Sequence, residues 1–99
     1  SIIDVVLDIR QQSSTFGKYF SMNLDANKRS IIIPSGFAHG FIALTDDTVV
    51  VYNQTSCYSR EHDSGIRWDS FGFEWNIESP IISDRDKMFV KFNEFKSPF

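Results

Sequence analysis

The first ten residues, Ser1–Arg10, read SIIDVVLDIR and alternate between two kinds of side chain. One parity is apolar and consists of Ile3, Val5, Leu7 and Ile9. Asp4 and Asp8 lie on the other parity, where we expect each carboxylate to be solvated or paired rather than catalytic. A period of two predicts a β-strand with one apolar face. Such a strand needs a neighbour on each edge, and because no initiator Met precedes it, we expect further residues upstream.

Turn residues recur about every eight to twelve positions along the rest of the chain, a spacing typical of an all-β fold. Further strands are expected at Lys18–Leu24, Phe37–Leu44 and Thr48–Thr55, the last with the highest density of β-branched residues. Turns are expected at Gln11–Gly17, Asp25–Arg29 and Asp46–Asp47. One helical turn is expected in SDRDKMF, with Ser83 as its N-cap. Because the chain shows no repeat or linker, we expect residues 1–99 to form a single domain, an antiparallel β-sandwich or barrel.

Composition excludes several classes of protein. The chain has 99 residues, is 41% hydrophobic and contains ten Phe, which favours a packed core over disorder. No apolar run approaches the ~18–20 residues of a membrane span, and no signal peptide is recognisable. A net charge of -3 offers no basic surface for nucleic acid. Cys57 is the only cysteine, which favours the cytoplasm, and no histidine lies at a partner position that would make it catalytic.

A lone imidazole lies in the segment Ile33–Phe41, IPSGFAHGF. If this segment enters a strand, the aromatic residues two positions either side of His39 share its face. Rings with a few polar groups are typical of a barrel lumen that holds a ligand, and Tyr52 would add to such a lumen from the next strand. The alternative is that both polar side chains are core residues with satisfied hydrogen bonds.

Four segments together resemble the dTDP-4-dehydrorhamnose 3,5-epimerases of dTDP-rhamnose biosynthesis. They are DVVLDIR..SSTFGKYFSMNL, NKRSIIIPSGFAHGFIAL, VVVYNQTSCYSREHDSGIRWD and PIISDRD, and they run from Asp4 to Asp86. The resemblance implies a cupin-type β jelly roll, here incomplete at its N-terminus, that usually forms a homodimer. It implies that dTDP-4-dehydro-6-deoxy-D-glucose is inverted at C3 and C5 to give dTDP-4-dehydro-L-rhamnose. The implied chemistry is proton abstraction α to the C4 ketone, with neither a metal nor an organic cofactor.

The resemblance also implies roles for five residues. Tyr52 matches the catalytic proton donor, since a phenol can protonate a carbanion reversibly. Asp86 matches the catalytic aspartate that orients the base histidine. His39 matches a second histidine that lines the sugar pocket, where it would hydrogen-bond a sugar or enolate oxygen. With His39 in that role, Gly36 and Gly40 would leave room for the sugar's close approach. Asp63 and Arg85 fall at positions that imply contacts to the nucleotide or its phosphates.

The chain departs from the family's pattern at the catalytic base. The resemblance places the base histidine in an upstream Arg-Gly-Leu-His type segment, followed by a lysine that assists at the enolate, and neither segment occurs in these 99 residues. The other histidine of the chain, His62, belongs to the loop YSREHDSG and is expected at the surface. We therefore expect the chain to be the C-terminal part of an epimerase and to be inactive alone.

Two other function classes remain open. A metal-dependent cupin needs several histidine and carboxylate ligands, typically two histidines one residue apart on a strand, whereas His39 and His62 are far apart. A non-catalytic cupin-like module would bind a nucleotide sugar or serve in assembly. Within the epimerase interpretation, inversion at C3 alone also stays open, although Tyr52 favours competence at C5.

Five further residues have simpler expected roles. Trp68 and Trp75 are expected to pack, and either could border the pocket as a stacking surface for a base. Lys28 and Arg29 are expected to be turn charges. Ser59 has no histidine and acid arranged around it, so nucleophilic catalysis has no support.

Overall fold

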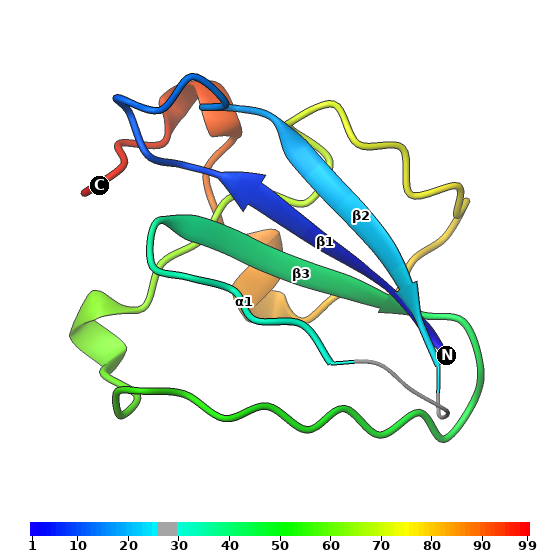
Figure 1. Ribbon diagram of the computed structural model, residues 1–99. Helices are drawn as coiled ribbons and strands as arrows, with labels where there is room; N and C mark the ends of the chain where they lie inside the picture. The colour runs from blue at the N-terminus through cyan, green and yellow to red at the C-terminus, as the bar shows by residue number, and fades with distance from the viewer. Residues whose placement is uncertain (26–29) are drawn as a thin grey trace.

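The computed structural model describes residues 1–25 and 30–99 (Figure 1). Its strands are β1 (Ile2–Asp8), β2 (Tyr19–Leu24) and β3 (Phe37–Ala43). They form one antiparallel sheet in the order β2-β1-β3. The short helices are η1 (Arg60–His62), α1 (Asp84–Lys87) and η2 (Phe92–Glu94). This architecture confirms the all-β class and is consistent with the cupin-type jelly roll.

β1 is the central strand and carries the core. Its register is given by its end pairs, Ile2–Leu24 and Leu7–Tyr19 towards β2, and Ile2–Ala43 and Asp8–Phe37 towards β3. Among the residues that the structure describes, the buried apolar side chains are Ile2, Val5, Leu7 and Ile9. Three of these four belong to the parity predicted to be apolar, and a strand with neighbours on both edges is the environment that β-branched residues favour. The strand predicted from the opening residues is therefore confirmed.

An aromatic layer covers the face of the sheet that carries Leu7. The ring of Tyr19, directly opposite Leu7, lies 5.3 Å from that of Phe73, and Phe73 lies 4.8 Å from Trp75. Both pairs are edge-to-face, an arrangement that aromatic quadrupoles favour. The Trp75 ring approaches Gly40 of β3, where an added Cβ would lie 3.8 Å from it. The aromatic stretch after residue 66 thus packs as a second layer on the sheet.

The hairpin between β1 and β2 is organised by the carboxylate of Asp8, which is fully buried. This carboxylate accepts hydrogen bonds from the backbone N–H of Arg10 at 2.9 Å and from the hydroxyl groups of Ser13 and Thr15. The Gly17 N–H donates to the Asp8 carbonyl at 2.9 Å. These bonds satisfy the polar groups of the predicted turn, which is confirmed.

The strand predicted at Thr48–Thr55 is wrong, because the structure forms no strand there. In Figure 1 the green segment that follows β3 runs clear of the three strands. The side chains of Val49 and Val51 are 84% and 81% exposed, so their β propensity meets no neighbouring strand. Propensity for a strand reflects packing against cross-strand neighbours, and none of the three described strands lies beside this segment.

Two other sequence predictions have different outcomes. The helical turn with Ser83 as N-cap is confirmed, since α1 begins at Asp84 and the Ser83 Oγ accepts from the Asp86 N–H at 3.2 Å. The turn at Asp25–Arg29, with its charges Lys28 and Arg29, lies largely outside the described residues. In the part of the chain that the structure describes, no helix is long and apolar enough to cross a membrane.

Candidate functional site

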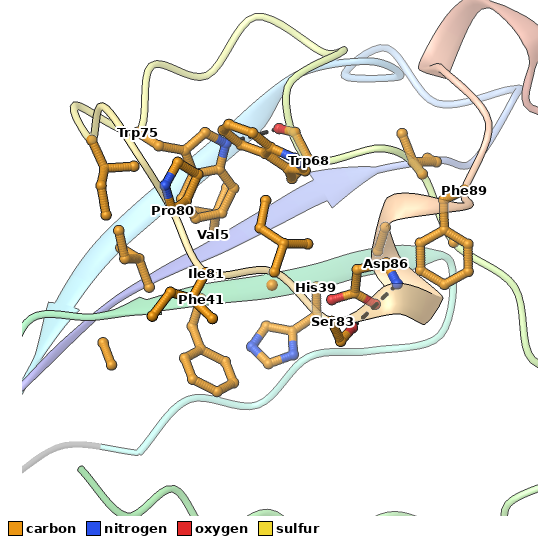
Figure 2. Close-up of a pocket in the computed structure, with 18 of the residues that line it drawn as sticks. Val5, His39, Phe41, Trp68, Trp75, Pro80, Ile81, Ser83, Asp86 and Phe89 are labelled. Carbon is orange, nitrogen blue, oxygen red and sulfur yellow. Dashed lines mark hydrogen bonds between the residues drawn. The ribbon is translucent and has the colours of Figure 1, made fainter. Parts of the chain in front are cut away.

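A cavity of about 840 Å³ lies along β3 and under the C-terminal part of the chain (Figure 2). Every residue of β3 lines it, together with Val5 and Leu7 of β1. The opposite wall is built from segments between residues 64 and 89, including α1. A volume of this size falls within the range of small-molecule sites, and the predominance of apolar lining residues is also typical of them.

His39 is the imidazole of the cavity, and a buried carboxylate holds it. His39 Nε2 lies 2.5 Å from Asp4 Oδ1, and the Asp4 side chain is only 3% exposed. Because Nε2 is the nitrogen that pairs with Asp4, Nδ1 faces away from the pair. Asp4 Oδ2 is buried and has no hydrogen-bond partner among the described residues. Asp4 is therefore paired, which is one of the two states expected for it.

The register of β1 and β3 explains why these two groups meet. His39 is directly opposite Val6, and Asp4 is directly opposite Phe41, so all four side chains lie on one face. Asp4 and His39 are therefore diagonal neighbours, within reach of a long side chain. The ring of Phe41 lies 6.3 Å from the imidazole and lines the same cavity.

Helix α1 brings a cation and a carboxylate to the opposite wall. Arg85 and Asp86 both line the cavity, and Asp63 joins them from the end of η1 through Arg85. The Arg85 Nε and Nη2 groups donate to the two Asp63 oxygens at 2.7 Å each, and Nη1 donates to Asp86 at 3.0 Å. These hydrogen bonds lower the pKa of Asp63 and raise that of Arg85. The Arg85 guanidinium also lies 5.0 Å from the ring centre of Phe89.

The structure does not bring Tyr52 to this cavity. Its side chain is 63% exposed, and it lies in the segment that was predicted to be a strand and is not one. Its assignment as a proton donor therefore stays a prediction. His62 is also exposed, as expected, and its Nδ1 lies 2.9 Å from Ser59 Oγ in the turn of η1.

The two tryptophans pack against each other and border the cavity. Their ring centres are 6.4 Å apart, and the Trp75 indole N–H donates to the Trp68 carbonyl at 2.8 Å. The expectation that they pack is confirmed, whereas a role as a stacking surface for a base stays a prediction. Gly40 also lines the cavity, whereas Gly36 does not, because the side chain of Arg10 occupies the space beside it. The expectation that Gly36 leaves room for a ligand is wrong.

Sequence reasoning missed the contribution of Arg10 and the partner of Asp4. The spacing Asp8-x-Arg10 was a usable signal for the first, because a side chain two residues on can return to a carboxylate. The Asp4–His39 pair joins residues 35 positions apart and depends on strand register, which the sequence did not supply. In the described residues no group of three or more His, Cys, Asp and Glu side chains is placed to hold a metal ion.

The cavity can bind a polar molecule with both neutral and anionic groups. His39 and Asp86 can exchange hydrogen bonds with hydroxyl or carbonyl oxygens, and Arg85 can contact an anion such as a phosphate. The apolar remainder can cover a ring, and the tryptophans add aromatic surface.

Comparison with known proteins identifies the family of the chain. Residues 1–94 match the family model described as dTDP-4-dehydrorhamnose 3,5-epimerase. A protein of that name from Shigella flexneri is 45% identical over 94 residues, which cover 92% of this chain and 52% of the relative. Those from Methanothermobacter thermautotrophicus and Escherichia coli K12 are 42% and 38% identical, over 94% and 95% of this chain and 54% and 53% of their own lengths. The chain thus spans about half the length of these curated relatives. It belongs to the dTDP-4-dehydrorhamnose 3,5-epimerase family.

Proposed function

We propose that this chain supplies the substrate cavity of an enzyme that inverts C3 and C5 of dTDP-4-dehydro-6-deoxy-D-glucose. The observation that carries the proposal is the meeting of His39, Arg85 and Asp86 in one cavity of about 840 Å³, in a chain of this family. The product would be dTDP-4-dehydro-L-rhamnose. Each inverted carbon is α to the C4 ketone, so the reaction needs a base, a proton donor and a group that stabilises the enolate oxygen.

His39 is suited to the third of these tasks. Asp4 fixes the ring through Nε2, so Nδ1 could bond the C4 oxygen. In the imidazolium form, in which both ring nitrogens carry hydrogen, the Nδ1–H could be donated to this oxygen as charge develops there. A ring held in advance loses little freedom when the substrate binds, which is the advantage of preorganisation. In this assignment His39 is the hydrogen-bonding histidine of the sugar pocket and does not abstract the proton.

Arg85 is suited to the nucleotide diphosphate. A guanidinium forms charge-assisted hydrogen bonds with phosphate oxygens in the same planar geometry that it uses here with Asp63. Asp63 holds Arg85 in place at the rim and is the second residue that we assign to nucleotide binding. The diphosphate would replace or share these contacts on binding.

Asp86 and Tyr52 complete the assignment as catalytic residues. Asp86 lines the cavity and would orient a base histidine that these 99 residues do not contain. Tyr52 would act as the proton donor once its segment is paired as a strand and carried to the substrate. Because the base is not supplied, we propose that the chain alone binds the nucleotide sugar without turning it over.

Solvent exchange tests this proposal. The chain is incubated in D2O with dTDP-4-dehydro-6-deoxy-D-glucose, and deuterium at C3 and C5 is followed by NMR and mass spectrometry. We expect no enzymatic incorporation at either carbon, against a full-length relative as positive control. Incorporation at C3 or C5 above the rate without protein would contradict inactivity of the chain alone, and the labelled position would show which carbon is deprotonated.

A homodimer is the assembly that we propose. The chain exposes 8047 Å², whereas a compact monomer of its size exposes about 5,800 Å². The excess is larger than the ~800 Å² that each partner contributes to a standard interface. Among the described strands, β2 and β3 each pair on one side only. Sedimentation equilibrium is expected to give twice the chain mass, and a monomer at all concentrations would contradict the proposed homodimer.

We also place the protein in the cytoplasm, where a lone cysteine stays reduced.

A second candidate function is a binding or assembly module without catalysis. The exposure of Tyr52, far from a packed position, is the observation that favours it. The two candidates predict different outcomes when an upstream segment of the Arg-Gly-Leu-His type is joined to the chain. If the chain is part of an enzyme, deuterium exchange should appear. If it is a binding or assembly module, the nucleotide sugar should bind without exchange.

A further inference from the structure

The guanidinium of Arg10 lies over the aromatic ring of Phe37, the first residue of β3. The Arg10 carbon Cζ lies 4.7 Å from the centre of the Phe37 ring. Phe37 is directly opposite Asp8, on the face of the ladder that also carries His39 two residues along β3. Phe37 and His39 both line the cavity. Arg10 therefore contacts the neighbour of the cavity histidine without lining the cavity itself.

Asp8 fixes the guanidinium in this position. It accepts from Arg10 Nε at 3.0 Å and from Arg10 Nη2 at 2.9 Å, and it is fully buried while the Arg10 side chain is 46% exposed. The same Nη2 donates to Ser13 Oγ at 3.1 Å. A planar guanidinium bound through two nitrogens has one orientation, which a lysine ammonium would not have.

Gly36 fixes the aliphatic part of the same side chain. A Cβ on Gly36 would lie 2.5 Å from Arg10 Cγ and 2.8 Å from Cδ, so the Arg10 side chain passes where a larger residue would stand. Gly36 has a φ of 95°, a conformation that glycine adopts without strain. Its carbonyl accepts from the Ile9 N–H at 3.0 Å, which ties the turn before β3 to the end of β1.

We propose that Asp8 and Arg10 are positioning residues for the cavity. Asp8 aims the Arg10 guanidinium, and the guanidinium holds the Phe37 ring, which lines the cavity on the strand face that also carries His39. This role rests on the function proposed above, in which His39 hydrogen-bonds the substrate. Neither Asp8 nor Arg10 touches the substrate, and both act through Phe37.

The histidine rings allow a direct test, because the chain contains only His39 and His62. In the Arg10→Met variant the aliphatic part of the side chain is kept and the cation is lost. We expect the His39 ring signals in an NMR spectrum of histidine-labelled protein to move, since the Phe37 side chain, two residues away on the same strand face, is released. The signals of exposed His62 should stay in place. Arg10→Lys, which keeps a cation above the ring, should move the His39 signals less.

Arg67→Met is the matched control. Arg67 forms the same kind of two-nitrogen pair with a carboxylate two residues on, Asp69, at 2.7 and 3.3 Å, but it does not line the cavity. We expect it to leave both histidines unmoved. The proposal is overturned if folded Arg10→Met, or folded Arg10→Lys should Arg10→Met not fold, keeps the His39 signals of the wild type. It is also overturned if Arg67→Met moves them as far as Arg10→Met does.

A second readout separates this proposal from the proposed function. With dTDP-4-dehydro-6-deoxy-D-glucose as the probe, Arg10→Met is expected to weaken binding about two- to fivefold, an effect of the size of one partly exposed cation–π contact. If the wild-type chain does not bind this sugar nucleotide, the proposed function fails while the histidine spectra still decide the positioning role. If the sugar nucleotide binds equally to wild type and Arg10→Met, the positioning role fails alone.

Discussion

At the scale of single residues, two carboxylates of one strand organise the site. Asp4 pairs with His39, and Asp8 binds Arg10 and the hairpin hydroxyls. The sequence predicted that both would be solvated or paired, and both are paired. The partner of Asp8 could have been predicted, because Arg10 is only two residues away. The partner of Asp4 could not, because the strand register determines that His39 lies beside it.

Asp8 should make the stability of the fold depend on acid. The Arg10 hydrogen bonds hold its pKa well below the usual range, while burial opposes them. A group with a lowered folded-state pKa stabilises the fold above its unfolded pKa of about 3.9, and this contribution is lost as the pH falls further. We expect the unfolding free energy of the wild type to fall below about pH 4, and that of Asp8→Asn to be lower at neutral pH and flatter below pH 4. Denaturant titrations at a series of pH values measure both.

Asp69→Asn is the control for this prediction. Its carboxylate also has a pKa lowered by an arginine, Arg67, but the side chain is 39% exposed. Exposed pairs contribute little to stability, so its curve should follow that of the wild type within about 1 kcal/mol. If the unfolding free energies of the wild type and Asp8→Asn depended equally on pH, Asp8 would not be the cause of the loss of stability in acid.

Gly36 should tolerate substitution less than another glycine of the same conformation. Gly36 and Gly72 have φ angles of 95° and 96°, so alanine is strained at both, at a cost of about 1 kcal/mol. Only at Gly36 does an added Cβ meet a side chain below 3 Å, that of Arg10, since at Gly72 the nearest atom is 3.9 Å away. Gly36→Ala should therefore lower the unfolding free energy by about 1–3 kcal/mol more than Gly72→Ala does. Equal losses in chemical denaturation would contradict the contact with Arg10.

At the scale of elements, sequence periodicity correctly predicted those strands that have a hydrogen-bonded neighbour strand in this chain. The strands β1, β2 and β3 and the cap of α1 follow from alternation and from one serine. The segment Thr48–Thr55 has the strongest local signal and forms no strand, because a strand also needs a hydrogen-bonding partner. The local sequence does not determine whether such a partner strand is present. Tyr52 belongs to this segment and therefore lies outside the cavity.

Amide hydrogen exchange should reproduce this division. β1 is hydrogen-bonded on both edges and holds the buried core, so its amides should exchange slowest in the chain. Amides of Thr48–Thr55 should exchange within the first time points, and limited proteolysis should cut there first. A set of protected amides in this segment would mean that it is paired in solution, either within the chain or with a second copy.

At the scale of the whole molecule, the chain is more open than its length requires. Its radius of gyration is 13.8 Å, against about 12.6 Å for a compact domain of this length. The cavity is nevertheless assembled, since β3, the tryptophans and α1 surround it without further partners. The sequence predicted four cavity or rim residues through a family resemblance, namely His39, Asp63, Arg85 and Asp86. It could not show which of its predicted residues the chain alone brings together.

The central claim is that this cavity binds the dTDP-linked sugar. Its most direct test is an NMR titration of the 99-residue chain with dTDP-4-dehydro-6-deoxy-D-glucose that follows the His39 ring and the Trp75 indole, with the backbone amides of residues 92–99 as a reference away from the cavity. We predict saturable shifts of the His39 and Trp75 signals while the reference amides stay in place. A folded chain in which neither cavity signal moves at saturating sugar nucleotide would contradict the claim.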